Sequence, residues 1–147
     1  MNVLKLSVTS LIALFLFSNG AIAQDTVSDK ELKQFATALQ QIQLIGQNTQ
    51  QQMVEAINKE KIAVDKFNEI RQAEIDPEKE ADASKEDLDK YKKAWKAVKQ
   101  IQIQSNTQME KSVEKEGLTT ERYQEIGAKV QADQKLMQKV QAILADN

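Results

Sequence analysis

Apolar side chains recur every three or four positions over two long stretches of the chain, which is the period of an amphipathic helix. The first stretch runs from Leu32 to Ile57 and the second from Leu88 to Val113. Each stretch predicts a long helix with one apolar stripe, and the first helix should reach about Glu60. A shorter stretch predicts one final helix, whose apolar side chains are Tyr123, Ile126, Val130, Leu136, Met137, Val140 and Leu144.

An internal repeat links the two long stretches, because shifting the chain by 56 residues superposes them without a gap. The superposed pairs include Ser28 with Ser84, Leu32 with Leu88, Phe35 with Tyr91, Leu39 with Trp95, Ile42 with Val98, Met53 with Met109, Ile57 with Val113, Phe67 with Tyr123, Glu69 with Glu125 and Ile70 with Ile126. This register predicts a duplication, with copies over about 27–75 and 83–144, and two helices in each copy.

Both copies begin with a helix start signal. Ser28 followed by Glu31 forms a capping box, in which each residue binds the other's backbone N–H, and Ser84 begins a less perfect version of it. Between the copies, Asp76 and Pro77 interrupt the helical pattern, and proline is favoured in the first turn of a helix.

The turn inside each copy is less evenly marked. In the second copy, Gly117 suits a left-handed helix end and Thr119 suits the N-cap of the next helix. In the first copy, Lys61 and Ala63 stand at these positions. Two interpretations therefore stay open for the first copy, namely a turn near Lys61 or one continuous helix over residues 28–75.

Neither helix pair buries its stripe unless the other pair covers it, so the pattern predicts an all-α antiparallel helical bundle built from two repeated hairpins. We expect two long helices and two shorter ones in a single domain over residues 24–147. A monomer and a swapped homodimer fit this pattern equally well.

The first 23 residues predict a signal peptide. Lys5 supplies a positive start, residues 11–17 an apolar core, and Ala21-Ile22-Ala23 a small-residue cleavage site. The chain has no cysteine, which excludes disulfides and a lipid anchor on Cys. We therefore expect an exported protein, periplasmic or secreted, that its core alone stabilises.

The composition of the chain argues against several classes of binding and catalytic site. The formal net charge of −2 argues against nucleic acid as a partner, because nucleic-acid binders normally carry a basic excess. The absence of both histidine and cysteine removes the commonest general base, the usual zinc ligands and a thiol nucleophile. No glycine-rich phosphate loop and no G-x-S-x-G motif occurs. The sequence predicts no catalytic, cofactor-binding or metal-binding residue.

Five polar positions are candidates for a functional role. Glu69 and Glu125 are equivalent in the repeat and would be the carboxylates of a hydrolase, although early helical turns favour acidic residues for structural reasons. Thr49 and Ser105 also coincide and fall on the apolar stripes, where they would line a polar pocket or bond to the backbone one turn earlier. Asp133 falls along the apolar stripe of the last helix. It would lie at the edge of the stripe, or its carboxylate would bind water.

Lysines and aromatic residues share part of the second long helix. One face carries Lys85, Lys92, Lys96 and Lys99, next to Tyr91 and Trp95. Such a face contacts anionic lipid or an acidic partner in some proteins, and is a solvated helix face in most. The many glutamines of residues 40–52 keep helical register with apolar residues and predict a polar helix face.

Four stretches carry a family resemblance, namely V-S-D-K-E-L-K-Q-F-A-T-A-L, M-V-E-A-I, G-L-T-T-E-R-Y-Q-E-I and D-Q-K-L-M-Q-K-V-Q-A-I-L. Together they resemble the exported bacterial proteins of the family called domain of unknown function 4168, from about Val27 to Leu144. The resembling motifs are caps, turns and core positions. The resemblance implies export and a helical fold, and it brings no established substrate, cofactor or catalytic residue.

These observations predict an exported, non-enzymatic helical protein that binds protein partners or acts like a chaperone in the periplasm or cell envelope. Two alternatives stay open. The first is an envelope-associated structural protein with peripheral contact to anionic lipid or polymer, and the second is a carboxylate-dependent hydrolase.

Overall fold

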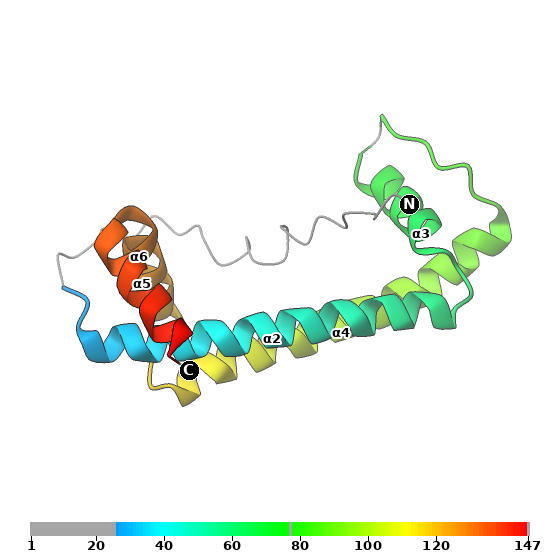
Figure 1. Cartoon of the computed structure of the whole chain (residues 1–147). Helices are drawn as coiled ribbons and strands as arrows, with labels where there is room; N and C mark the ends of the chain where they lie inside the picture. Colours follow the sequence, from blue (N-terminus) through cyan, green and yellow to red (C-terminus); the bar gives the residue numbers. More distant parts are fainter. Residues whose placement is uncertain (1–25, 77, 147) are drawn as a thin grey trace. The chain divides into compact units, whose positions relative to one another are not determined.

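The computed structural model describes residues 26–76 and 78–146, and these residues are helical without any strand (Figure 1). The predicted signal peptide and Pro77 lie outside the described residues. The described part contains five helices: α2 (Asp29–Lys59), α3 (Val64–Ile75), α4 (Lys85–Lys115), α5 (Thr120–Ala132) and α6 (Gln134–Ala145). The prediction of an all-α chain is confirmed.

The chain divides into two compact units. Unit 1 contains the described residues up to Gln43 and those from Met109 onward, and unit 2 contains Leu44–Gln108. Because α2 and α4 each cross a boundary, both long helices contribute residues to both units. The single domain over residues 24–147 stays a prediction.

Both long helices begin at the predicted serines. The Ser28 N–H donates to Glu31 Oε2 at 2.9 Å, and the Glu31 N–H donates to Ser28 Oγ at 3.2 Å. Ser84 and Asp87 make the same two bonds at 3.1 Å. These bonds satisfy backbone donors that a helix start otherwise leaves without partners, so the predicted caps are confirmed.

A turn separates α2 from α3, so the alternative of one continuous helix over residues 28–75 is wrong. Lys61 has φ 57°, and Gly117, its equivalent in the second copy, has φ 83°. Thr119 accepts a hydrogen bond from the Arg122 N–H at 3.1 Å, as predicted, whereas Ala63 caps α3 without a side-chain bond. A lysine therefore takes the left-handed conformation that glycine takes more easily.

The final helix is broken, so the predictions of one last helix and of two shorter helices in all are also wrong. Asp133 has an extended backbone between α5 and α6, with φ −119° and ψ 111°. Its Oδ1 atom accepts hydrogen bonds from the N–H groups of Lys135 at 2.8 Å and Leu136 at 3.4 Å. The short acidic side chain competes for backbone donors and starts a new helix.

The core of unit 1 combines α2 with the end of α4 and with α5 and α6. Its buried apolar residues are Leu32, Phe35, Ala36, Ala38, Val113, Leu118, Ile126, Val130 and Val140. Phe35 stacks on Tyr123 with ring centroids 4.8 Å apart. At the edge of this core, Arg122 Nε donates to Glu31 Oε1 at 2.8 Å and joins α5 to the start of α2.

The core of unit 2 combines the end of α2 with α3 and the start of α4. Its buried apolar residues are Ile57, Ile62, Phe67, Ile70, Tyr91, Ala94 and Val98. Phe67 and Tyr91 lie with ring centroids 5.0 Å apart. The Tyr91 hydroxyl donates to Glu74 Oε2 at 2.6 Å, which brings its polar end to the edge of the core.

The two cores use matching positions of the sequence repeat. Buried positions related by the 56-residue shift are Phe35 and Tyr91, Ala38 and Ala94, Val113 and Ile57, Leu118 and Ile62, and Ile126 and Ile70. Each core takes one member of every pair, so each core contains residues from both predicted copies.

Candidate functional site

The candidate carboxylates are each bound to a basic neighbour on the same helix. Glu69 lies on α3 in unit 2, 2.6 Å from Lys66 Nζ, and accepts a hydrogen bond from the Asp82 N–H at 2.8 Å. The Lys66 bond lowers the pKa of Glu69, whereas a general acid requires a raised pKa. Glu125 lies on α5 in unit 1, 2.9 Å from Arg122 Nη1. Both ion pairs join residues three positions apart on one helix, and Glu69 also binds the connection between α3 and α4.

The two candidate hydroxyls lie together in unit 2. Thr49 Oγ1 and Ser105 Oγ form a hydrogen bond of 2.8 Å, and Thr49 Oγ1 also lies 2.7 Å from the Ile45 carbonyl oxygen. Since a hydroxyl carries one proton, Thr49 cannot donate both bonds, and Ser105 must donate one if both form. Both side chains are buried. They form a small buried polar contact between α2 and α4.

The predicted lysine face is present on α4. Lys85, Lys92, Lys96 and Lys99 are exposed, and Tyr91 is buried in the core as expected. Trp95 is half-buried between two cations, with Arg71 Cζ at 4.2 Å and Lys99 Nζ at 5.6 Å from its ring. These distances permit cation–π attraction. The arrangement holds a tryptophan at the edge of a basic surface.

An uncharged surface lies on the parts of α2 and α4 that belong to unit 2. Residues 44–54 and 100–108 contain no Asp, Glu, Lys or Arg, although 29% of the chain is charged. We call these two segments the amide surface, because their exposed residues include Gln47, Asn48, Gln51, Gln52, Gln100, Gln104 and Asn106. Leu44 and Ile103 are 62% and 66% exposed on the same segments.

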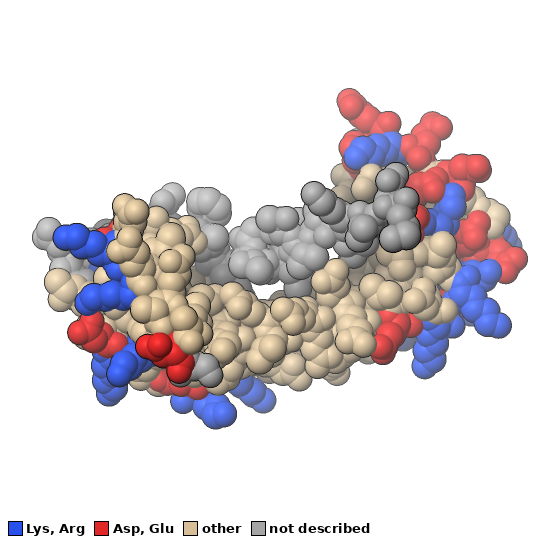
Figure 2. All heavy atoms as spheres, in the orientation of Figure 1, with Lys and Arg blue, Asp and Glu red and all other residues tan. Residues whose placement is uncertain are grey.

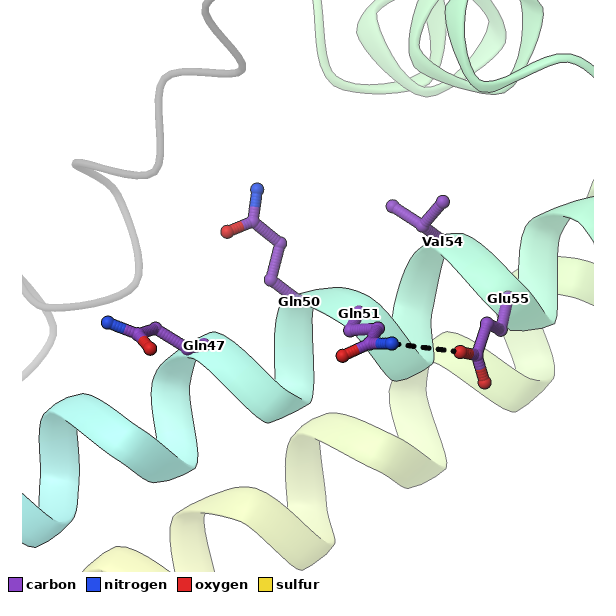
Figure 3. Close-up of a pocket in the computed structure, with 5 residues that line it drawn as sticks. All are labelled: Gln47, Gln50, Gln51, Val54 and Glu55. Carbon is purple, nitrogen blue, oxygen red and sulfur yellow. Dashed lines mark hydrogen bonds between the residues drawn. The ribbon is translucent and has the colours of Figure 1, made fainter.

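The amide surface includes a shallow depression on α2 (Figure 3). Its lining residues are Gln47, Gln50, Gln51, Val54 and Glu55. Gln50 and Val54 project away from α4, and Gln51 donates to Glu55 Oε1 at 3.4 Å (Figure 3). Because one helix supplies all five side chains, the depression does not enclose a small ligand.

Charged side chains of unit 2 concentrate away from the amide surface. Acidic side chains gather over the connection between α3 and α4, and basic ones gather along the first part of α4 (Figure 2). No group of three acidic side chains that would hold a metal ion occurs among residues 26–76 and 78–146. Every helix in that part of the chain is too short or too polar to span a bilayer.

Two features were not identified from the sequence. The Arg122–Glu31 ion pair joins residues 91 positions apart, and no local pattern predicts such a pairing. The sequence shows the amide surface as two charge-free runs, and the register of its glutamines predicts no more than a polar helix face. Its place on two helices in contact becomes visible through the Thr49–Ser105 hydrogen bond.

The described residues define a small all-helical protein with two hydrophobic cores and surfaces that differ sharply in charge. The chain belongs to the family described as Domain of unknown function (DUF4168), whose model matches residues 28–140. This match confirms the family resemblance of the sequence motifs. No curated protein and no solved structure matches the chain.

Proposed function

We propose that this chain is an exported, non-enzymatic interaction protein, and that the amide surface binds a protein partner in the periplasm or outside the cell. The leader over residues 1–23 supports export. A protein that binds a partner without catalysing a reaction recognises it through a folded surface whose polarity differs from that of the rest of the protein. Both segments of the amide surface lack charged residues, although 29% of the chain is charged.

The proposed architecture is an antiparallel bundle of two repeated hairpins. Three observations support it: the matching buried positions of the two cores, the left-handed residues at Lys61 and Gly117, and the bond between Thr49 and Ser105. The last two residues are 56 positions apart, which is the shift of the repeat. Two equivalent positions that contact each other are expected where two copies pack antiparallel about a two-fold axis.

Charge depletion supports binding at the amide surface, because the centres of protein interfaces contain few charged residues. Burying a charge costs several kcal/mol unless it is paired, whereas a carboxamide both donates and accepts and adapts to many partners. Leu44 and Ile103 add apolar area that water covers in the free protein. A partner that covers both side chains gains roughly 1.5 to 3 kcal/mol for each.

A specific partner is favoured over unfolded clients. A chaperone-like role requires a continuous apolar groove, whereas the large exposed apolar side chains of the described residues are dispersed over several helices. They are Leu44, Ile75, Leu88, Ile103 and Met137. The lowered pKa of Glu69 and the ion pair of Glu125 support a non-enzymatic role.

Site-specific photo-crosslinking in the producing cell tests this proposal. A photoreactive residue at Gln51 lies on the amide surface, and the matched control at Glu114 is equally exposed on α4 but belongs to unit 1. We expect one discrete adduct with a second protein from position 51 and none from position 114. Equal adducts from both positions, or none from position 51, would reject the amide surface as the binding site.

A further inference from the structure

The first part of α4 carries a second surface, of which the proposed function uses only Ile103. Leu88, Lys92, Lys96, Lys99 and Ile103 follow one another at steps of three or four residues, so they share one side of the helix. All five are exposed, and we call them the lysine sector. The sector begins and ends with an apolar side chain, about 22 Å apart at the helical rise of 1.5 Å per residue.

The positive charge of the lysine sector is not neutralised within the described residues. Lys92, Lys96 and Lys99 form no ion pair there, whereas Lys90, on another side of α4, lies 2.6 Å from Glu86. Asp89 is the acidic residue at the edge of the sector. Three ammonium groups without an ion pair, within two helical turns, attract an anionic partner.

The exposed apolar residues decide which anionic partner fits. Ile103 is 66% exposed and Leu88 38% exposed, and both lie on the same side as the lysines. A soluble polyanion would leave these side chains in water. An anionic bilayer offers phosphate groups to the ammonium ions and acyl chains to the apolar side chains, as interfacial helices require.

We propose that the lysine sector of α4 docks this protein peripherally onto a bilayer that contains anionic phospholipid. Trp95 lies next to the sector, where it contacts Lys99 and Arg71, so the aromatic ring reaches the interface together with the lysines. Each lysine near an anionic membrane strengthens binding about fivefold, and three together about a hundredfold. The three lysines lie outside the amide surface, so their salt-dependent binding to vesicles is tested separately from a protein partner.

The test uses vesicles of phosphatidylcholine with and without phosphatidylglycerol, and the protein in the processed form that the cell accumulates. Trp95 is the only tryptophan of the chain, so its fluorescence reports on this surface alone. We expect brominated phosphatidylglycerol to quench Trp95, and co-sedimentation with anionic vesicles to fall steeply as salt rises, because salt screens the attraction. No binding to anionic vesicles at low salt would overturn the proposal.

Matched variants identify the surface. The triple variant Lys92→Gln, Lys96→Gln and Lys99→Gln should lose about a hundredfold in vesicle partitioning. The control Lys30→Gln, Lys111→Gln and Lys135→Gln removes the same charge from exposed positions of unit 1 and should bind within a fewfold of the unaltered protein. Equal losses in both triple variants would overturn the assignment to α4.

A third variant distinguishes binding to lipid from binding to soluble polyanions. Ile103→Gln keeps every charge and should weaken vesicle partitioning about tenfold, because Ile103 is buried against acyl chains but not against a soluble polyanion. The same variant should bind soluble polyphosphate as the unaltered protein does. If Ile103→Gln partitions unchanged, the sector binds polyanions only and the lipid assignment is wrong. Circular dichroism confirms that each variant is folded, as glutamine suits helices nearly as well as lysine.

Discussion

Replacing Gly117 by alanine tests how strictly the turn between α4 and α5 requires glycine. Gly117 has φ 83°, in the left-handed region that side chains with a Cβ atom adopt at a cost. A Cβ atom built there lies 2.8 Å from Gln34 Nε2, which is too close for contact. That amide donates to the Glu116 carbonyl oxygen, so moving it breaks a hydrogen bond between α2 and the turn.

These contributions set the magnitude of the effect. The left-handed conformation costs an alanine roughly 1 to 2 kcal/mol. Loss of the Gln34 hydrogen bond adds about 1 kcal/mol. Alanine also reduces the entropy of the unfolded chain, which offsets about 0.4 to 1 kcal/mol. We expect Gly117→Ala to lower the free energy of unfolding by about 2 kcal/mol.

Urea unfolding followed by far-UV circular dichroism measures this change, and Gly46→Ala is the matched control. Gly46 lies inside α2 with no atom within 4 Å of a built Cβ, so the same substitution should stabilise the protein by about 0.5 to 1 kcal/mol. The slope of the free energy of unfolding against urea concentration should be the same in both variants as in the unaltered protein. A decrease of less than about 0.5 kcal/mol in the free energy of unfolding of Gly117→Ala would show that this turn does not require glycine. Any decrease in Gly46→Ala would show that alanine destabilises the protein even inside a helix.

Three further changes have defined outcomes. Lys61→Gly should raise the midpoint of urea unfolding by relieving the left-handed lysine, a gain of about 1 kcal/mol, and an unchanged or lower midpoint would contradict this. The hydrogen bond from Arg122 holds the pKa of Glu31 near 2 instead of 4.5, so stability should fall as pH drops from about 4.5 to 2, by about 1 kcal/mol after screening. Glu31→Gln should flatten this part of the pH profile, and an equally steep profile would exclude the ion pair as its cause. Thr49→Val should cost about 1 to 2 kcal/mol by leaving the Ser105 hydroxyl buried with one bond fewer, and adding Ser105→Ala should recover most of it. If the double variant is the least stable, the unpaired Ser105 hydroxyl is not the cause of the loss in Thr49→Val.

The sign of the pH dependence follows from the direction of the pKa change. A carboxyl group whose pKa is lowered in the folded state binds fewer protons there than in the unfolded chain. Its contribution is complete above the unfolded pKa and is lost as pH falls through the folded pKa. The Glu31 side chain is 24% exposed, so solvent reduces the energy that the pKa difference alone would suggest.

Local patterns predicted most of the helices. The stripes of α2 and α4 and the serine caps depend on neighbours within four residues, and such signals can be read from one chain. Asp133 also had a local signal, because an aspartate directly before a helical stretch is a common N-cap. The apolar residues on either side of Asp133 keep the helical period, so the pattern predicts one continuous helix there.

Tertiary contacts decided the features that the sequence left open. Lys61 carries no local preference for the left-handed region, and the turn forms because Ile62 and Phe67 are buried beside Tyr91. The Glu31–Arg122 pair likewise depends on how α5 packs on α2. Of the candidate surfaces, the lysine face was predicted from its spacing, whereas the exposure of Ile103 on the same side required the structure.

Both cores contain residues from both halves of the chain, so we expect that neither half folds without the other. The direct measurement uses two fragments, residues 24–79 and 80–147, examined by circular dichroism and analytical ultracentrifugation at low micromolar concentration. We expect that neither fragment alone is a folded monomer, and that mixing them restores the helical signal and one cooperative melting transition. A fragment that is helical, monomeric and cooperatively melting on its own would show that one half folds without the other.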